Sequence, residues 1–266
     1  MINPKFSIIT VVYNNFDGIE QTILSVTNQV FKEFEYIIID GCSTDGTLEL
    51  IEKHKKNIDK IITEPDMGIY DAMNKGINES KGEYILFMNS GDIFSSRNVL
   101  SDLAIHCTAD IVYGNVLFVF DENSSVQVIP KGLSYLPHGM PFVHQAAFVK
   151  LKYARNNKFD QRYRLAADYD FFWRCYMIGL SFKYIDINVC NFKPGGVSDN
   201  NPSVILECSK IVKQHAPEQH RAWYFAMKYI LCWFKYHFTR LIGLEKYSLL
   251  RKKKRNILDF VKTNHR

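Results

Sequence analysis

Hydrophobic and polar positions follow two different periods along the first ninety residues of the chain. Residues 6–12 and 35–40 are nearly continuous runs of β-branched and aromatic side chains, which are typical of strands buried on both faces. Between them, Ile19, Ile23 and Val26 recur at helical spacing and predict a helix over residues 18–29. Strand, helix and strand in this order predict a βαβ unit with a right-handed crossover.

The same alternation continues and then loosens after residue 95. The further predicted elements are, in chain order, a helix over 46–56, a strand over 58–63, a helix over 69–80, and strands over 84–88, 110–120 and 144–149, then a helix over 164–179 and a strand over 182–192. Strands that alternate with helices predict an α/β fold with an open, mostly parallel sheet flanked by helices.

Polar residues gather where the predicted parallel strands end, which is the edge at which such sheets bind ligands. These clusters are Tyr13-Asn14, residues 40–45, residues 64–66 and residues 89–92. Asp40 follows a buried strand directly, where a carboxylate can accept a hydrogen bond from a ring N–H or a ribose hydroxyl. In the stretch YILFMNSGDIF, residues 84–94, an apolar strand leads to Asp92 as its one carboxylate.

Charge is distributed unevenly along the 266 residues. Residues 221–266 carry 12 Lys and Arg against two acids, whereas the rest of the chain has a net charge of about −5. This contrast predicts two parts: an α/β domain over residues 1–205 and a basic, helical extension over residues 206–266. A basic extension favours a partner that carries phosphates.

Residues 221–242 are apolar around most of a helical circumference, yet Arg221, Lys228 and Lys235 interrupt them at heptad spacing. These charges argue against a spanning helix and favour an amphipathic helix in the plane of a membrane, with the aromatics in the bilayer and the basic stripe on anionic headgroups. The run Arg251–Arg255 adds to this attraction, so we expect residues 221–255 to contact an anionic membrane surface. The alternative is a helix packed on the α/β domain or in a homo-oligomer. Nothing resembles a nucleic-acid-binding module.

The six cysteines are scattered without a CxxC pair, and no leader segment opens the chain. Both features favour reduced thiols in a cytoplasmic protein. Together with the basic extension, they predict a protein that is peripheral at the inner face of the plasma membrane.

Four ordered segments, residues 7–14, 39–47, 64–76 and 82–92, resemble family 2 glycosyltransferases of the GT-A fold. The resemblance extends over about residues 5–200. Within the family, the chain is similar to bacterial enzymes that build exopolysaccharide, capsule or O-antigen. It implies transfer of a sugar, with inversion, from a nucleotide sugar, which we expect to be UDP-linked. It also implies a hydroxyl acceptor on a glycan or on a polyprenyl-diphosphate-linked saccharide.

In many members of this family a D-x-D pattern holds a divalent cation on the donor diphosphate. Here Asn89-Ser90-Gly91-Asp92 leaves Asp92 alone, and we expect it to bind Mn²⁺ or Mg²⁺, which prefer oxygen ligands. The reduced pattern leaves a metal-independent mechanism open. Asp92 is alternatively an N-cap for a helix over residues 95–106.

The resemblance also assigns residues to the donor. The expected donor-binding residues are Thr10, Tyr13, Asn14, Asp40, Asp66, Lys75, Asn89, Ser90 and Gly91. Asp66 and Asp71 are alternatively caps of the helix that begins near Ile69, and Lys75 is alternatively a solvated side chain.

Transfer needs a base, because an acceptor hydroxyl is a weak nucleophile until its proton is removed. The matching family segment is residues 165–172, in which Asp168 aligns best as the base and Asp170 is the alternate. Asp168 is alternatively an acid favoured by the helix dipole. The resemblance further places His144, Gln145, Gly195, Gly196 and Ser198 near the acceptor or the departing phosphate, although a structural histidine and a plain turn also account for these residues.

Two other functions are consistent with parts of the pattern. A sugar nucleotidyltransferase also folds around a nucleotide, but its glycine-rich and basic loop after the first strand is replaced here by Tyr13-Asn14-Asn15-Phe16. A catalytically idle, membrane-bound nucleotide-binding partner is suggested by the weakened D-x-D pattern.

Overall fold

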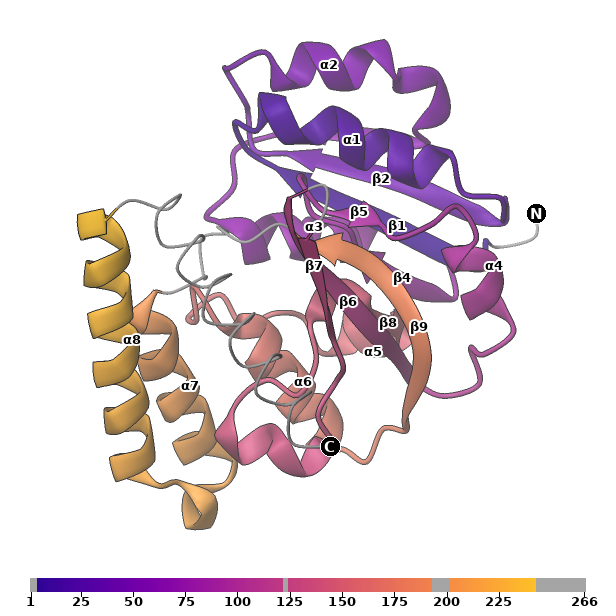
Figure 1. The fold of residues 1–266 in the computed structure, drawn as a ribbon. Coiled ribbons are helices and arrows are strands. Elements are labelled where there is room, and N and C mark those ends of the chain that lie inside the picture. The colour runs from indigo at the N-terminus through magenta and orange to yellow at the C-terminus, as the bar shows by residue number, and fades with distance from the viewer. Residues whose placement is uncertain (1–3, 122–123, 193–200, 243–266) are drawn as a thin grey trace, which may run out of the picture.

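The computed structural model describes residues 4–121, 124–192 and 201–242 (Figure 1). Its strands are β1 Phe6–Val12, β2 Phe34–Asp40, β3 Lys60–Thr63, β4 Tyr84–Phe87, β5 Ile93–Phe94, β6 Ile111–Asp121, β7 Ser124–Val128, β8 Ala147–Lys150 and β9 Phe182–Phe192. Its α-helices are α1 Phe16–Thr27, α2 Thr47–Lys53, α3 Ile69–Glu79, α4 Val99–Ala104, α5 Leu151–Asn156, α6 Ala167–Met177, α7 Pro202–His215 and α8 Ala222–Ile242. Short 3₁₀ turns are η1 Lys55–Asn57, η2 Leu133–His138, η3 His144–Ala146 and η4 Pro217–Gln219.

One mixed sheet forms the centre of the molecule, with the strand order β3-β2-β1-β4-β8-β6-β9-β5 and with β7 paired to β6. Strands β3, β2, β1 and β4 are parallel, and β8 is antiparallel to both β4 and β6. Val12 pairs with Asp40, and Asp40 pairs with Thr63, so the carboxyl ends of three strands lie together. The predicted α/β fold with a mostly parallel sheet is confirmed.

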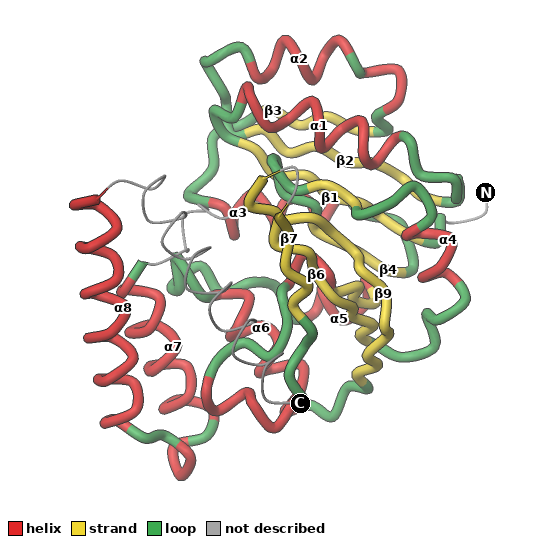
Figure 2. The backbone as a smooth tube through the Cα atoms, in the orientation of Figure 1, coloured by secondary structure: helices red, strands yellow, loops and turns green. Residues whose placement is uncertain are grey.

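Helices cover both faces of this sheet (Figure 2). Because side chains alternate between the faces of a strand, Ile9 and Ile37 enter the core shared with α3, α5 and α6. Ile8 and Ile38 enter the core shared with α1, α2 and α4. Burial on both faces accounts for the continuous apolar runs in the sequence.

Two segments differ from the predicted elements. The helix expected over residues 95–106 is shortened to α4. Ile93 and Phe94 pair with β9 as strand β5, and the Ser95 N–H still donates to the Val189 carbonyl of β9 at 3.0 Å, so the helix begins only at Val99. The strand expected over 144–149 begins with the 3₁₀ turn η3 and becomes extended only at β8.

Helix α7 packs against α6, and α8 packs against α7, on the side that Figure 1 shows in orange and yellow. The expected boundary between residues 205 and 206 falls inside α7, and Ile211, Val212 and Phe225 belong to the same core cluster as α6. A separate extension therefore stays a prediction. Within the described ranges, no helix is both long enough and apolar enough to cross a bilayer.

Candidate active site

The loop after β1 is hydrogen-bonded to the loop after β2 at the carboxyl ends of the strands. Asn14 adopts a left-handed conformation, with φ 47°, that turns its amide toward the loop after β2. Its backbone N–H donates to Ser43 Oγ at 2.8 Å, and its side-chain oxygen accepts from the Thr44 N–H at 2.8 Å. Asn14 thus fastens two loops to each other at the mouth of the sheet.

Tyr13, Asp40 and Asp66 gather around Gly41. The Asp40 side chain is buried and accepts a hydrogen bond from the Ser43 N–H at 3.1 Å. A Cβ atom placed on Gly41 would stand 2.5 Å from Asp66 Oδ2 and 3.3 Å from the Tyr13 ring, so a larger residue here would displace the Asp66 carboxylate. The Asp66 carboxylate and the exposed Tyr13 ring thus lie close together, beside the residue that follows Asp40 in the chain.

Two expected donor residues take structural positions instead. Thr10 is fully buried and donates to the Met88 carbonyl at 2.8 Å, so the structure does not place it at the surface of the site. Lys75 pairs with Glu64 at 3.0 Å and donates to the Pro65 carbonyl at 2.6 Å. Partial burial lowers the pKa of Lys75, but its carboxylate partners outweigh this effect and raise the pKa overall. Lys75 therefore fastens the loop that carries Asp66 rather than pointing at a ligand.

The turn over residues 89–92 is clamped onto α1. Asn15 Nδ2 donates to the Ser90 carbonyl at 3.0 Å, and Gly91, with φ 100°, donates its N–H to Thr22 Oγ1 at 2.9 Å. The clamp directs Asp92 inward, where 7% of the residue is exposed. Helix α4 has Asn98 as its N-cap, so the capping alternative for Asp92 is wrong.

The 3₁₀ turn η3 connects the two expected functional acids. His144 Nδ1 lies 3.0 Å from Asp168 Oδ2, and Gln145 Nε2 donates to Asp92 Oδ2 at 3.2 Å. Asn89 Nδ2 lies 3.4 Å from His144 Nε2. With Asn89 as the donor in that pair, His144 donates from Nδ1 and holds the Asp168 carboxylate in place. Two neighbouring residues thus bring the strand-end acid and the helix acid into one site.

Asp168 lies at this site, and Asp170 does not. Asp168 Oδ1 accepts from the Tyr70 hydroxyl at 3.0 Å, and 18% of the Asp168 side chain is exposed. Burial would raise the pKa of Asp168, but hydrogen bonds from His144 and Tyr70 outweigh it and hold the pKa below its usual value. The Asp170 carboxylate is buried between Arg174, at 2.8 Å, and His215, at 2.7 Å, and so ties α6 to α7.

Asp92 has the electrostatic character of a cation ligand. Burial raises its pKa to about 6, although the nearby His144 and the hydrogen bond from Gln145 counteract this rise. Asn89 Oδ1 is buried without a hydrogen-bond partner among the described residues. A carboxylate and an amide oxygen suit Mn²⁺ or Mg²⁺. The described ranges contain no cluster of three His, Cys, Asp or Glu residues for a metal, so phosphate and water oxygens would have to complete the shell.

Two residues that support Asp168 were not predicted. Tyr70 was passed over although it belongs to a matched motif segment. Glu207, on α7, accepts backbone N–H bonds from Arg164 at 3.1 Å and from Leu165 and Ala166 at 2.9 Å. No local pattern marks Glu207, because its partners are more than 40 positions away in the chain. The expected phosphate residues Gly195, Gly196 and Ser198 lie outside the described residues.

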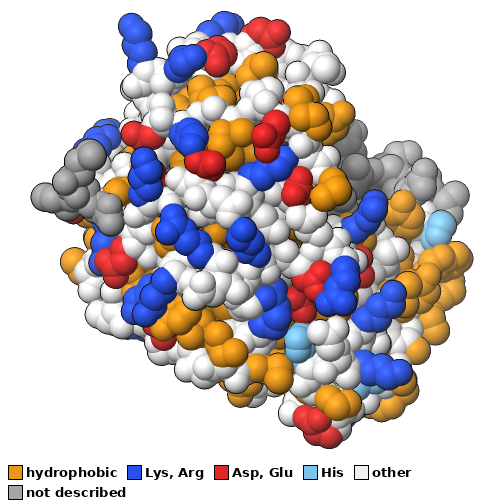
Figure 3. Space-filling model, turned by 180° about the vertical axis from the view of Figure 1, so that it is seen from behind, with side chains coloured by type: hydrophobic (Ala, Val, Ile, Leu, Met, Phe, Trp, Pro, Cys, Tyr) orange, Lys and Arg blue, Asp and Glu red, His pale blue; other side chains and the backbone are white. Residues whose placement is uncertain are grey.

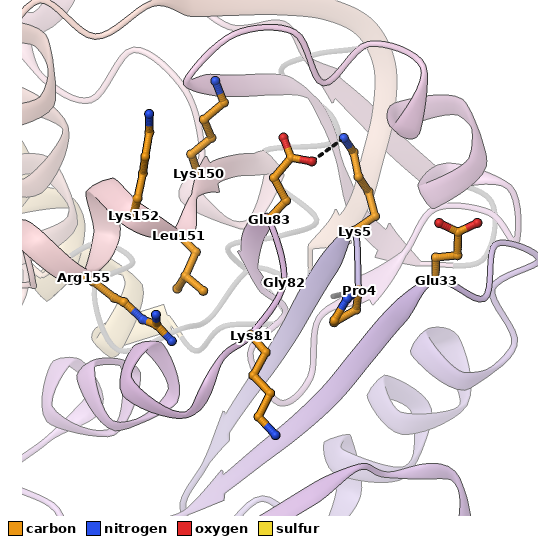
Figure 4. A pocket seen from close by; sticks show the side chains of 10 residues that line it. All are labelled: Pro4, Lys5, Glu33, Lys81, Gly82, Glu83, Lys150, Leu151, Lys152 and Arg155. Carbon is orange, nitrogen blue, oxygen red and sulfur yellow. Dashed lines mark hydrogen bonds and ion pairs between the residues drawn. The ribbon is translucent and has the colours of Figure 1, made fainter. Parts of the chain in front are cut away.

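A large surface hollow lies away from this chemistry. It has a volume of about 690 Å³ and is found at the opposite end of the parallel strands, beside Pro4, Gly82 and Glu83. Five Lys and Arg side chains line it, but Figure 4 shows Lys81 and Lys150 pointing in opposite directions, and Lys5 pairs with Glu83. The side chains do not converge on a common point, so we do not assign the hollow to the reaction.

Comparisons with known proteins agree with the fold and with the order of the motifs. The model of the family described as glycosyl transferase family 2 matches residues 7–168. A PGL/p-HBAD biosynthesis glycosyltransferase of Mycobacterium tuberculosis is 29% identical over 218 residues, which cover 75% of this chain and 81% of the relative.

Solved structures show the same fold. S. aureus TarS, residues 1–349 in complex with UDP-GlcNAc, superposes with a TM-score of 0.63 at 18% identity and covers 80% of this chain and 67% of its own. A mannosyltransferase from Pyrobaculum calidifontis, in complex with GDP-Man and Mn²⁺, superposes with a TM-score of 0.61 at 17% identity and covers 97% of this chain and 81% of its own.

These matches place the chain in a known class of enzyme. The chain belongs to glycosyl transferase family 2 and has the GT-A fold. It is a glycosyltransferase, which decides between this function and the two alternatives raised by the sequence.

Proposed function

We propose that this enzyme transfers a sugar from a UDP-linked donor to a hydroxyl of a glycan or lipid-linked acceptor, with inversion. The observation that carries this proposal is the turn η3, in which His144 and Gln145 hold Asp168 and Asp92 in one site. Direct inversion needs a base on one side of the anomeric carbon and a leaving-group site on the other. A site with two carboxylates of different electrostatic character suits this division of labour.

Asp168 acts as the base in this proposal. Its lowered pKa keeps the carboxylate ionised at neutral pH, and Tyr70 and His144 fix its orientation. The acceptor oxygen attacks the anomeric carbon as Asp168 takes its proton, and the bond to the nucleoside diphosphate breaks on the opposite face. An α-linked donor therefore gives a β-linked product.

The donor lies along the strand ends in the same proposal. Asp40 and Asp66 accept hydrogen bonds from the base or ribose, and the Tyr13 ring packs against the base. Asn89, Ser90 and Gly91 form the turn beside the diphosphate, and Asp92 with Asn89 Oδ1 would hold Mn²⁺ or Mg²⁺ there. When bound, the cation supplies positive charge for the leaving diphosphate. The complexes of the structural relatives with UDP-GlcNAc and with GDP-Man and Mn²⁺ support this placement.

The proposed acceptor and the proposed cellular location rest on the sequence pattern and on the family resemblance. We place the reaction at the cytoplasmic face of the plasma membrane, in the synthesis of a surface polysaccharide or glycolipid. A polyprenyl-diphosphate-linked saccharide fits a peripheral enzyme, because such an acceptor is confined to the bilayer. The family resemblance to enzymes of exopolysaccharide synthesis and the name of the mycobacterial relative support this assignment.

The first experiment is to incubate the full-length protein with a panel of nucleotide sugars and to measure nucleoside diphosphate release, with Mn²⁺ and with EDTA. We expect release from one UDP-sugar, stimulated by a glycan or lipid-linked acceptor and abolished by EDTA. Asp92→Ala and Asp168→Asn should each lower the turnover number by at least about 10²-fold, the scale of a lost catalytic group.

Matched variants decide which part of the proposal holds. Glu218→Gln removes an exposed acid on η4 and should leave turnover unchanged. Turnover that survives EDTA and Asp92→Ala would rule out the metal assignment and leave Asp168 in place. An α-linked product from an α-linked donor, seen by NMR, would rule out inversion.

A further inference from the structure

One face of α8 is apolar and is turned away from the rest of the described protein. Trp223, Met227, Ile230, Leu231, Phe234 and Phe238 recur at spacings of three and four residues, and all are exposed. Trp233 is exposed at the flank of this stripe. When Figure 1 is turned by 180°, α8 comes to the right, and Figure 3 shows apolar side chains gathered along that edge. We call this surface the outer face of α8.

The opposite face of α8 binds the body of the protein. Phe225 is buried in the main core, and Tyr224 and Lys228 donate to the His138 carbonyl at 3.3 Å and 2.8 Å. The sequence suggested a basic stripe on the headgroup side, but the structure directs Lys228 inward. The helix thus has its apolar side outward, the reverse of a helix that merely covers a soluble core.

We infer that the outer face of α8 docks on an anionic lipid bilayer and lies in its interfacial layer. Charge favours this occupant over a second copy of the chain. Residues 221–242 contain Arg and Lys but no acid, and the segment that follows contains the run Arg251–Arg255. Two copies joined through α8 would bring like charges together, whereas an anionic bilayer complements them. Trp and Phe side chains on the stripe suit the boundary between headgroups and acyl chains.

Docking through this face also fits the position of the active site. In Figure 1, β1 and β2 run toward the side of the molecule on which α8 stands, so the carboxyl ends of these strands lie on that side. His138, whose carbonyl binds α8, is the last residue of the 3₁₀ turn η2. The Leu136 carbonyl of the same turn accepts a hydrogen bond from Tyr169, which follows Asp168 in the chain. The use of this surface to reach a lipid-linked acceptor rests on the proposed function, but the docking itself does not.

The test uses the full-length protein and vesicles of phosphatidylcholine with and without phosphatidylglycerol. The chain has three tryptophans; Trp173 is buried, and Trp223 and Trp233 lie on or beside the outer face. We expect sedimentation with the anionic vesicles and a blue shift of tryptophan emission on binding. The double variant Trp223→Ser with Phe234→Ser should weaken vesicle binding by about tenfold or more, since it removes two large apolar contacts.

The control is a double variant of equally exposed apolar residues elsewhere, Ile105→Ser with Ile178→Ser, at 75% and 63% exposure, which should bind vesicles as the wild type does. Absence of binding, or binding that the α8 variant does not weaken, would overturn the inference. So would emission that is already blue-shifted without lipid, because another copy or the chain's own last residues would then cover the face. UDP-sugar binding, measured by calorimetry without lipid, tests the proposed function separately.

Discussion

At the scale of single residues, the ionised carboxylate of Asp92 is expected to lower the free energy of unfolding. Its pKa is about 6 in the folded state, against about 3.9 for an unfolded Asp. Below pH 4 the carboxyl is protonated in both states and costs nothing, whereas above pH 6 the folded protein carries a buried charge that costs as much as about 3 kcal/mol. Asp92→Asn should therefore raise the melting temperature at pH 7.5, by roughly 2–8 °C, with no gain at pH 4.

The same thermal measurement reports on the cation. Mn²⁺ together with a UDP-sugar should raise the melting temperature of the wild type at pH 7.5, because a ligand that binds the folded state stabilises it by mass action. The Asp92→Asn variant should show little of this rise. An equal rise in both proteins would mean that Asp92 is not a ligand.

Tyr70 is expected to tune the base without touching the donor. Tyr70→Phe removes a hydrogen bond to a charged carboxylate, an interaction of about 1.5–3 kcal/mol. The turnover number should fall by about tenfold with the donor KM unchanged, and the acid limb of its pH profile should move to higher pH. Tyr163→Phe is a matched control, because this tyrosine also bonds through its hydroxyl, to Gln214 at 3.0 Å, away from the site. A shift in donor KM alone would contradict the assignment.

The sequence located the functional edge better than it located the side chains on that edge. Asp40, Asp92 and Asp168 were predicted from strand ends and motifs. The structure links Asp92 and Asp168 through η3 and buries Asp40 at the end of β2, and their roles stay predictions. The burial of Thr10 was not visible in the motif order, because a buried strand directs alternate residues into a core. The ion pairs of Lys75 with Glu64 and Asp71 are contacts that the spacing of the motifs does not reveal.

At the scale of elements, α7 is expected to position α6 through Glu207. Its carboxylate accepts the three N–H groups of residues 164–166, just before the helix that carries Asp168, and α6 has no capping side chain of its own at Ala166. Glu207→Ala should lower the turnover number by about tenfold and stability by about 2 kcal/mol, and Glu207→Gln, which keeps one acceptor oxygen, should recover part of both.

Donor binding separates this positioning role from general unfolding. The calorimetric Kd for the UDP-sugar should be the same in Glu207→Ala as in the wild type, because the hydrogen bonds of Glu207 go to residues 164–166 and not to the strand-end loops. A parallel loss of donor binding and turnover would indicate that the variant only unfolds the domain.

Elements set by local periodicity were predictable, and elements set by distant pairing were not. The helices and parallel strands of the first ninety residues follow the apolar pattern closely. Strand β5 has only two residues and exists because β9 pairs with it across almost 100 positions of the chain. The turn η3 likewise bends away from a strand where its side chains reach Asp92 and Asp168.

At the scale of the whole molecule, the sequence indicated a basic extension but not which face of its helix packs against the rest of the protein. The charge count separates residues 221–266 from the rest, and the heptad spacing of the cations is visible without a structure. Which side of α8 faces the body depends on Phe225 and on the carbonyl of His138, which local composition does not reveal. The apolar side of the helix therefore faces outward although its pattern alone allowed either orientation.

The unequal charge of body and extension leads to a prediction about salt. Attraction between the basic extension and an anionic bilayer acts over a Debye length, which falls from about 10 Å at 0.1 M salt to about 3 Å at 1 M. Donor binding at the active site depends on short, partly buried contacts that salt screens much less. With a lipid-linked acceptor in anionic vesicles, transfer should therefore fall steeply with salt, whereas slow hydrolysis of the UDP-sugar in solution should change little. Replacing Arg251–Arg255 by glutamine should give the low transfer rate already at 0.1 M salt and leave hydrolysis intact. An equal salt response of both reactions would mean that the extension acts on the catalytic site itself and not through the membrane.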